Sequence, residues 1–191
     1  MGYSLEKHGL KNGTIDDNYQ YLFEPVNYEK TRFVRYHLPT LKKYASECDN
    51  ITEMGVDSAN TTWAFLSSRP KKLTSIDIIN TKAPEIVALA EELAKKEGIN
   101  FKFVLGDTTE IQIEPTDFLY IDTLHTYPQL KRELELHPQN VSKYIAFHDT
   151  HMPIFTNMAK ALSEFLKENS NDWEICYDTK ESCGLTIIKR K

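Results

Sequence analysis

Short apolar runs alternate with helical patterns over most of the chain. Besides a first strand that ends at Glu53, the apolar runs predict strands at residues 73–78, 101–105, 117–122 and 143–148. The intervening segments have apolar residues three and four positions apart, which predicts helices at residues 61–68, 84–97, 127–137 and 154–168. The link from 106 to 116 is too short for much of a helix. Such alternation is typical of a parallel sheet covered by helices on both faces.

The two ends of the chain follow other patterns. Residues 1–26 are polar and contain turn-forming glycines, so we expect an N-terminal arm or lid. Residues 27–47 look helical, with a break at Pro39 and a one-sided apolar face at Phe33, Tyr36, Leu41 and Tyr44. Two strands at 173–177 and 185–189 form an antiparallel hairpin. The chain is therefore predicted to be one domain over residues 1–191, with a Rossmann-like doubly wound α/β core at 27–191.

Composition limits the partners of this domain. The 191 residues carry a net charge of −5, so no nucleic-acid partner is expected. No 18 apolar residues run together, and no membrane association is expected. The spacing of Cys48, Cys176 and Cys183 matches no zinc motif, and an odd number of cysteines suggests reduced thiols in a cytoplasmic protein. No secretory leader is recognised at the start. A homo-oligomer stays open.

The segment 51–62 contains the most informative pattern. It reads as a strand end, a tight turn with Gly55, and a helix start, with Glu53 just before the turn. Gly55 would let the backbone come close to a ligand, and Glu53 would offer a carboxylate to an ammonium or hydroxyl group. An acid in the turn would repel phosphate, and the segment lacks the glycines and lysine of a phosphate loop. We predict a nucleotide-type site that does not bind phosphate.

Acidic residues follow the other predicted strands as well, at Asp77, Asp107, Asp122 and Asp149. In an open parallel sheet, ligands bind outside the carboxyl ends of the strands. Asp77, at the second strand end, suits the two hydroxyls of a ribose. Asp107, beside Thr108, suits an adenine amino group or a simple Asx turn, and both roles can hold together.

The motifs together resemble a known family. They are Glu-Met-Gly-Val-x-Ser-x-x-Thr-Thr, Ser-Ile-Asp-Ile, Gly-Asp-Thr, Tyr-Ile-Asp-x-x-His-x-Tyr and Phe-His-Asp-Thr. This pattern resembles class I S-adenosylmethionine-dependent methyltransferases, and within them the cephalosporin-hydroxylase-type and sugar O-methyltransferase-type branch. The resemblance covers roughly residues 45–190.

The resemblance implies S-adenosyl-L-methionine as cofactor. The residues implied to surround its methionine part are Glu53, Gly55, Ser58 and Asn60. Asp77, followed by Ile78, would hold the ribose, and Asp107 with Thr108 would lie on the adenine side. Asp122 would border the same cofactor site.

The resemblance also raises the question of a divalent metal such as Mg²⁺ or Mn²⁺. Some relatives bind one with acids at the positions of Asp122, His148 and Asp149. The sequence departs from the pattern at Ala59, where glycine is usual, at Leu124, where an acid is common, and at His148. Two alternatives stay open: a metal held by Asp122, His148 and Asp149, or a His148–Asp149 pair that shapes the cavity without metal.

Histidines are the candidates for acid–base chemistry. His125 lies three residues after Asp122 and can face the same crevice as a general base, or it can cap the following helix. His151 could serve either arrangement of the site. His8, His37 and His137 lie away from strand ends, and we expect them on the surface.

These inferences predict a methyltransferase that acts on a hydroxyl of a small molecule, such as a saccharide, with His125 and Asp122 as catalytic residues. Two alternatives remain: transfer to nitrogen or carbon, and a cofactor-binding relative without catalysis. The motif of nucleic-acid amine methylation, Asp/Asn-Pro-Pro-Tyr/Phe, is absent after the fourth strand.

Overall fold

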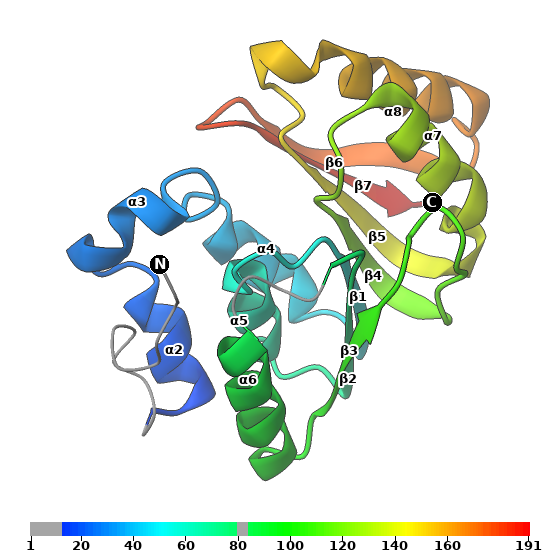
Figure 1. Ribbon diagram of the computed structural model, residues 1–191. Helices are drawn as coiled ribbons and strands as arrows, with labels where there is room; N and C mark the ends of the chain where they lie inside the picture. The colour runs from blue at the N-terminus through cyan, green and yellow to red at the C-terminus, as the bar shows by residue number, and fades with distance from the viewer. Residues whose placement is uncertain (1–12, 80–83) are drawn as a thin grey trace.

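The computed structural model of the protein describes residues 13–79 and 84–191. Seven strands in this part of the chain form one sheet with the order β3-β2-β1-β4-β5-β7-β6 (Figure 1). The strands are β1 (Asn50–Met54), β2 (Lys72–Asp77), β3 (Asn100–Leu105), β4 (Thr116–Ile121), β5 (Val141–His148), β6 (Trp173–Thr179) and β7 (Leu185–Arg190). The first five strands run parallel, and β7 lies antiparallel between β5 and β6. The predicted fold class is confirmed, including the C-terminal hairpin.

The helices are α2 (Ile15–Tyr21), α3 (Tyr28–Thr31), α4 (Leu38–Ala45), α5 (Asn60–Leu66), α6 (Pro84–Lys96), α7 (Tyr127–Leu136) and α8 (Thr156–Glu168). Helices α5, α6 and α7 connect the parallel strands, as the apolar spacing predicts, whereas α2, α3 and α4 precede β1 and α8 leads from β5 to β6. Short 3₁₀ turns lie at Pro25–Asn27, Pro138–Asn140 and Pro153–Phe155. No regular helix forms in the link between β3 and β4. None of the helices in the described ranges has both the length and the apolar character needed to cross a membrane.

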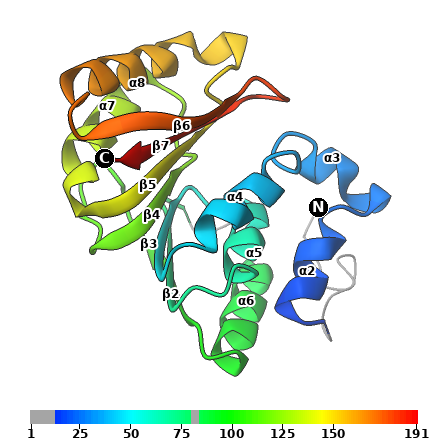
Figure 2. The ribbon, with the colours of Figure 1, turned by 180° about the vertical axis from the view of Figure 1, so that it is seen from behind.

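The sheet separates two apolar cores. Figures 1 and 2 show α4, α5 and α6 on one face of the sheet and α7 and α8 on the other. The first core contains buried side chains of α5 and α6, such as Phe65 and Leu93, and the second packs α7 and α8 through Leu130 and Phe165. Because both faces are covered, the central strands β1 and β4 are buried nearly throughout, and the alternating burial of a one-sided sheet is absent.

The N-terminal segment differs from the extended arm expected for residues 1–26. Thr14 and Asp17 form a capping box, in which the Thr14 hydroxyl accepts from the Asp17 N–H at 3.1 Å and the Asp17 carboxylate accepts from the Thr14 N–H at 2.8 Å. The helix α2 that follows buries Ile15 and Tyr19 against the first core. The segment predicted as an arm or lid thus contains a helix that packs on the first core. Residues 1–12, with His8, lie outside the described part of the chain.

Pro39 also has a different role from the one predicted. It occupies the first turn of α4, where the missing N–H of proline is no loss, so it begins a helix and does not interrupt one. The apolar side chains expected on one face are divided: Leu41 is buried, whereas Phe33 and Tyr36 are about half exposed. The segment is two short helices with different orientations.

Gly55 lies where β1 and β4 come closest. Its backbone has φ +87°, and a Cβ atom there would lie 1.9 Å from the carbonyl oxygen of Asp122. The Gly55 N–H donates to Ile76 O at 2.9 Å, and the Asp122 N–H donates to Met54 O at 2.9 Å. The glycine is thus required for the passage of the chain between two neighbouring strand ends.

We predict that Gly55→Ala lowers the free energy of unfolding by more than about 3 kcal/mol, because backbone strain and a backbone clash add. Gly98→Ala is the matched control: Gly98 also has a positive φ, of +74°, but a Cβ atom there would have no neighbour within 4 Å. It should cost only about 1–2 kcal/mol. Urea denaturation of both variants measures the difference, and equal losses would contradict the steric argument.

Candidate active site

A cavity of about 810 Å³ opens at the carboxyl ends of the parallel strands. It is lined by eight of the nine residues expected near a cofactor: Gly55, Ser58, Asn60, Asp77, Ile78, Asp107, Thr108 and Asp122. His125, His148 and Asp149 line the same cavity, so the fold brings the two predicted groups together. Its wall also contains apolar side chains, among them Phe33, Val34, Leu124 and Met152. A volume in the range of about 300–1,000 Å³ is typical of sites for small molecules and cofactors.

The Asp77 carboxylate stabilises the turn between β1 and α5 through hydrogen bonds. One carboxylate oxygen accepts from the backbone N–H of Val56 at 2.8 Å and of Asp57 at 3.2 Å, and the other accepts from Ile79 N–H at 3.1 Å. An ionised carboxylate offers about four acceptor sites, so these bonds leave capacity for ligand hydroxyls. Asp77 therefore both shapes the turn and presents a negative charge to the cavity.

The turn itself uses an unusual backbone. Asp57 and Ala59 have φ values of 44° and 58°, in the left-handed region that favours glycine. Ala59 takes a conformation that glycine would adopt without strain. Ser58, between them, donates its hydroxyl to the Asp57 carboxylate at 2.9 Å.

Glu53 is placed differently from its expected position at the ligand. It is fully buried behind the turn and is absent from the cavity lining. Its carboxylate accepts hydrogen bonds from the hydroxyls of Thr61, Thr62 and Ser75. Burial raises the pKa of Glu53 to about 7, although these hydrogen bonds act in the opposite direction. In this structure the carboxylate ties α5 and β2 to the end of β1.

Asp107 takes part in the Asx-type turn that the sequence left open. Its Oδ1 accepts from the backbone N–H of Thr109 at 2.8 Å and from the Thr109 hydroxyl at 2.7 Å. These hydrogen bonds lower the pKa of Asp107, so the group is an anion at neutral pH. The neighbouring Thr108 donates its hydroxyl to Glu133 on α7 at 2.5 Å. Asp107 keeps acceptor capacity for a ligand amino group.

Two carboxylates and two imidazoles form the centre of the site. The Nε2 atom of His125 lies 2.9 Å from Asp122 Oδ1 and 3.1 Å from Asp149 Oδ2. The Nδ1 atom of His148 lies 3.3 Å from Asp122 Oδ2 and 3.5 Å from Asp149 Oδ1. The side chains of Asp122 and His125 are 25% and 22% exposed, whereas that of His148 is 5% exposed. Both imidazoles therefore line the cavity, but the His148 ring is almost completely buried.

The electrostatics of this group favour charged pairs. Burial alone would raise the pKa of Asp122, but the charge of His148 and the hydrogen bond from His125 hold it well below its usual range. Burial alone would lower the pKa of His125, but the hydrogen bond and charge of Asp122 raise it above the ordinary value. For His148 the charge of Asp122 outweighs burial even more, and its pKa lies well above 6.5. The carboxylates are ionised and attract protons to both rings.

Some side chains of this region carry no signal in the sequence. The Tyr120 hydroxyl, two residues before Asp122, donates to Asp122 Oδ2 at 3.0 Å. His37 and His137, expected on the surface, are buried, with 1% and 0% exposure. His137 lies 2.8 Å from the Thr108 carbonyl through Nε2, and His37 packs edge-on against His148. These positions depend on tertiary contacts, which spacing along the chain does not reveal.

His151 and Leu124 are both set apart from the central group. His151 Nε2 lies 2.9 Å from Asp178 Oδ1 on β6, so the His151 side chain contacts the C-terminal hairpin. Leu124 lines the cavity and is 65% exposed, on the turn between β4 and α7. Leu124 thus adds an apolar surface to the cavity wall.

One group of oxygen and nitrogen atoms here has the composition of a metal site. Single ligand atoms of Asp122, His148 and Asp149 all lie within 4.8 Å of one another. Two carboxylates and one imidazole suit Mn²⁺, Fe²⁺ or Zn²⁺ better than Mg²⁺. The Nε2 atom of His125, however, already bridges the same two carboxylates. The geometry is that of a hydrogen-bonded acid–imidazole group.

Comparison with known proteins gives matches in structure only. No family model and no curated protein matches the sequence. A suggested caffeoyl-CoA O-methyltransferase from Staphylococcus aureus superposes with a TM-score of 0.65 at 14% identity, covering 98% of this chain and all of the other. An rRNA methylase from Escherichia coli gives 0.61 at 16% identity over 92% of this chain and 71% of the other.

A magnesium protoporphyrin IX methyltransferase from Synechocystis, solved with bound SAH, gives a TM-score of 0.56 at 9% identity. It covers 84% of this chain and 85% of the other. These proteins act on different acceptors, and the identities are low. The comparison therefore establishes the fold, a Rossmann-like fold shared with methyltransferases, and leaves the activity to be argued from the site.

The buried Glu53 gives a pH-dependent prediction. Its pKa is about 7 in the folded chain against an ordinary 4.5, so the folded state binds this proton more tightly. The stability from this group is complete below about pH 4.5 and is lost as the pH rises through about 7. Relative to Glu53→Gln, which cannot titrate, the parent should lose about 3 kcal/mol of unfolding free energy between about pH 4.5 and pH 8.

Urea denaturation at several pH values measures this difference. Glu92→Gln, on the exposed face of α6, is the control and should leave the pH dependence unchanged. A constant difference between parent and Glu53→Gln would show that the buried carboxylate keeps its ordinary pKa.

Proposed function

We propose that the protein is an S-adenosylmethionine-dependent methyltransferase that transfers the methyl group to a hydroxyl of a small molecule. One observation carries the proposal: in a methyltransferase fold, the Gly55–Asn60 turn, Asp77 and the Asp122–His125 pair all line one cavity. The first part of this set suits a cofactor, and the second suits proton transfer from an acceptor.

The residues present fit the cofactor. Asp77 would accept hydrogen bonds from the two ribose hydroxyls with the acceptor sites that the turn leaves available. Ile78, which is 64% exposed beside it, would pack on the adenine ring, and Asp107 would accept from the adenine amino group. Gly55, Ser58 and Asn60 would surround the methionine part. When bound, the cofactor supplies a methyl group on a positively charged sulfur.

His125 would act as the general base. Its Nε2–H is held by Asp122 and Asp149, a tautomer that places the basic lone pair on Nδ1. As the acceptor hydroxyl loses its proton to this nitrogen, the two carboxylates stabilise the imidazolium that forms. Asp122 thereby orients the ring and balances its charge, as the acid does in a nucleophile–His–Asp triad. The Tyr120 hydroxyl fixes Asp122 in turn.

The acceptor side of the cavity is apolar. Phe33, Val34, Leu124 and Met152 contribute to its wall, and Phe33 and Leu124 are largely exposed to the solvent. Such a wall excludes water from the transfer step and suits a small acceptor with one apolar face, which a pyranose ring or a catechol offers. The net charge of −5 gives no support for a nucleic-acid acceptor.

Two rival functions predict different results in one experiment. Turnover of cofactor is measured with panels of saccharides and catechols, and with amine and carbon acceptors. Transfer to an amine or carbon alone would replace the O-methylation proposal. A cofactor-binding relative without catalysis would retain the cofactor and transfer nothing to any acceptor.

The ribose role of Asp77 is tested by binding. Asp77→Ala should weaken the affinity for S-adenosylhomocysteine by about 1.5–3 kcal/mol, the value of hydrogen bonds to a charged group. Asp117→Ala is the matched control, since Asp117 also accepts from backbone N–H groups, those of Asp49 and Asn50, but at the amino ends of the parallel strands. Calorimetry should show unchanged affinity for the control. No binding by the parent, or equal effects of both variants, would argue against the assignment.

The base role of His125 is tested by turnover. His125→Ala should lower turnover by about 10²–10⁴-fold with little change in cofactor affinity, and His125→Gln should not restore it, since an amide accepts no proton at neutral pH. Because the pKa of His125 is raised, the rate should begin to fall at a pH above 6.5 as the solution is made more acidic. His151→Ala is the control, since His151 is also paired with a carboxylate at 2.9 Å, but with Asp178 on β6 and not with Asp122 or Asp149. Near-parent turnover of the glutamine variant would reduce His125 to a positioning residue.

Metal dependence of turnover distinguishes a metal site at Asp122, His148 and Asp149 from a group that works without metal. His125 already bridges Asp122 and Asp149, which supports the metal-free mechanism. Turnover should therefore be unchanged when Mg²⁺ or Mn²⁺ is added to protein dialysed free of both ions. A large activation by either ion would instead indicate that it displaces His125 from the two carboxylates and polarises the acceptor oxygen.

A further inference from the structure

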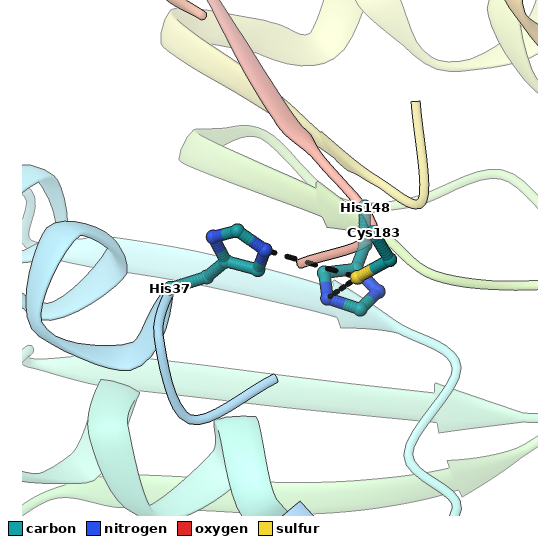
Figure 3. A group of neighbouring side chains, drawn as sticks. All are labelled: His37, His148 and Cys183. Atoms are coloured by element: carbon teal, nitrogen blue, oxygen red, sulfur yellow. Dashed lines mark hydrogen bonds between the residues drawn. The ribbon is translucent and has the colours of Figure 1, made fainter. Parts of the chain in front are cut away.

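Three side chains of types that bind metals, from distant parts of the chain, meet beside the cavity at His148. His37 directly precedes α4, His148 ends β5, and Cys183 lies in the turn between β6 and β7 (Figure 3). Cys183 and His37 are 146 residues apart, and all three side chains are buried, with exposures of 0%, 1% and 4% for Cys183, His37 and His148. The mechanism proposed above uses neither His37 nor Cys183.

The spacing of the three ligand atoms is that of a tetrahedral site. Cys183 Sγ lies 3.3 Å from His148 Nε2 and 3.7 Å from His37 Nε2. With Zn–S and Zn–N bonds of about 2.3 and 2.0 Å, tetrahedral angles place sulfur and nitrogen ligands about 3.5 Å apart. The two observed distances lie on either side of this value. All three atoms lie within 4.8 Å of one another, so one ion can reach them together.

A second observation is the environment of the other nitrogen of His148. This Nδ1 is buried without a well-aligned hydrogen bond and lies 3.3 Å from Asp122 Oδ2. Histidines that bind zinc through one nitrogen commonly present the other to a carboxylate, which orients the ring and makes it a better ligand. A small shift of the ring toward an ion on the Nε2 side would align this contact.

We propose that His37, His148 and Cys183 bind a single zinc-type divalent ion. A site of two imidazoles and one thiolate binds Zn²⁺ in preference to Mg²⁺ and Ca²⁺. A water molecule would complete the tetrahedron. On binding, the Cys183 S–H bond and the Nε2–H bond of protonated His148 break and both protons leave to solvent. Three lone pairs then form bonds to the ion without any change of oxidation state.

This ion would have a structural role. It joins the segment before α4 and the C-terminal hairpin to the end of β5, next to Asp122. The site is independent of the proposed methyl transfer, because none of its arguments uses the cofactor or the acceptor. It also differs from the Asp122–His148–Asp149 set, since it uses Nε2 of His148 and a thiolate.

The test titrates metal-free, reduced full-length protein with Co²⁺, which takes the place of Zn²⁺ and absorbs light. We expect one equivalent to bind with a thiolate-to-cobalt charge-transfer band in the near ultraviolet and the visible bands of a tetrahedral ion. Added Zn²⁺ should abolish both. Binding without the thiolate band, or no binding, would overturn the proposal on the parent protein alone.

Variants then assign the ligands. Cys183→Ser should lose the charge-transfer band, and His37→Asn should weaken binding at least about tenfold. Cys176→Ser is the matched control, since this half-buried thiol on β6 contacts the Ile187 carbonyl and lies outside the cluster. Asp122→Asn should keep the thiolate band, because Asp122 is not a ligand. Retention of the band in Cys183→Ser, or its loss in Cys176→Ser, would place the ion elsewhere.

Thermal unfolding measures metal binding independently of the absorption bands. Zn²⁺ at roughly a thousand times its Kd should raise the Tm of the parent and of Cys176→Ser by about 10 °C. The Tm of Cys183→Ser should rise far less. Equal shifts in all three proteins would mean that zinc binds at other histidines or acids, and would also overturn the proposal. Loss of methyl transfer with an intact thiolate band would affect only the proposed function.

Discussion

The close approach of the backbone at the ends of β1 and β4 determines the geometry of the whole site. Gly55 passes so near the Asp122 carbonyl that no side chain fits between them, and its N–H is bonded to Ile76 at the end of β2. Three neighbouring strand ends are thereby fixed within one small region. The acids that follow β2 and β4, Asp77 and Asp122, consequently face one cavity, and the cofactor and acceptor halves of the proposed reaction share it.

The acids at the strand ends share a position but differ in environment, and their environments decide what each can do. Glu53 is buried behind the turn and accepts hydrogen bonds from three hydroxyls. Burial raises its pKa, and the side chain has a structural role. Asp77 and Asp107 accept backbone N–H bonds at the cavity surface, which hold their loops while leaving acceptor sites. Asp122 lies between two imidazoles, which keep it ionised. Only the last arrangement supports proton transfer.

The sheet and most cavity residues could be predicted from the sequence because their signals are local. An apolar run that ends in an acid marks a strand end, and the fold rule for parallel sheets brings those ends together. The burial of His37 and of Cys183 had no local signal, since each depends on a contact with the end of β5 more than 30 residues away. The Thr14–Asp17 capping box was visible in the sequence, however, and marked a helix within the segment interpreted as an arm.

His148 links the two halves of this region through the two nitrogens of one ring. Nδ1 faces the carboxylates of Asp122 and Asp149, and Nε2 faces the Cys183 sulfur. A positive charge on this ring lowers the pKa of Asp122 and so keeps the acid ionised beside His125. A proton on Nε2 supplies that charge, and a divalent ion bound to Nε2 would supply it without depending on pH. The buried cluster and the Asp122–His125 pair are therefore coupled electrostatically, whether His148 carries a proton or a divalent ion.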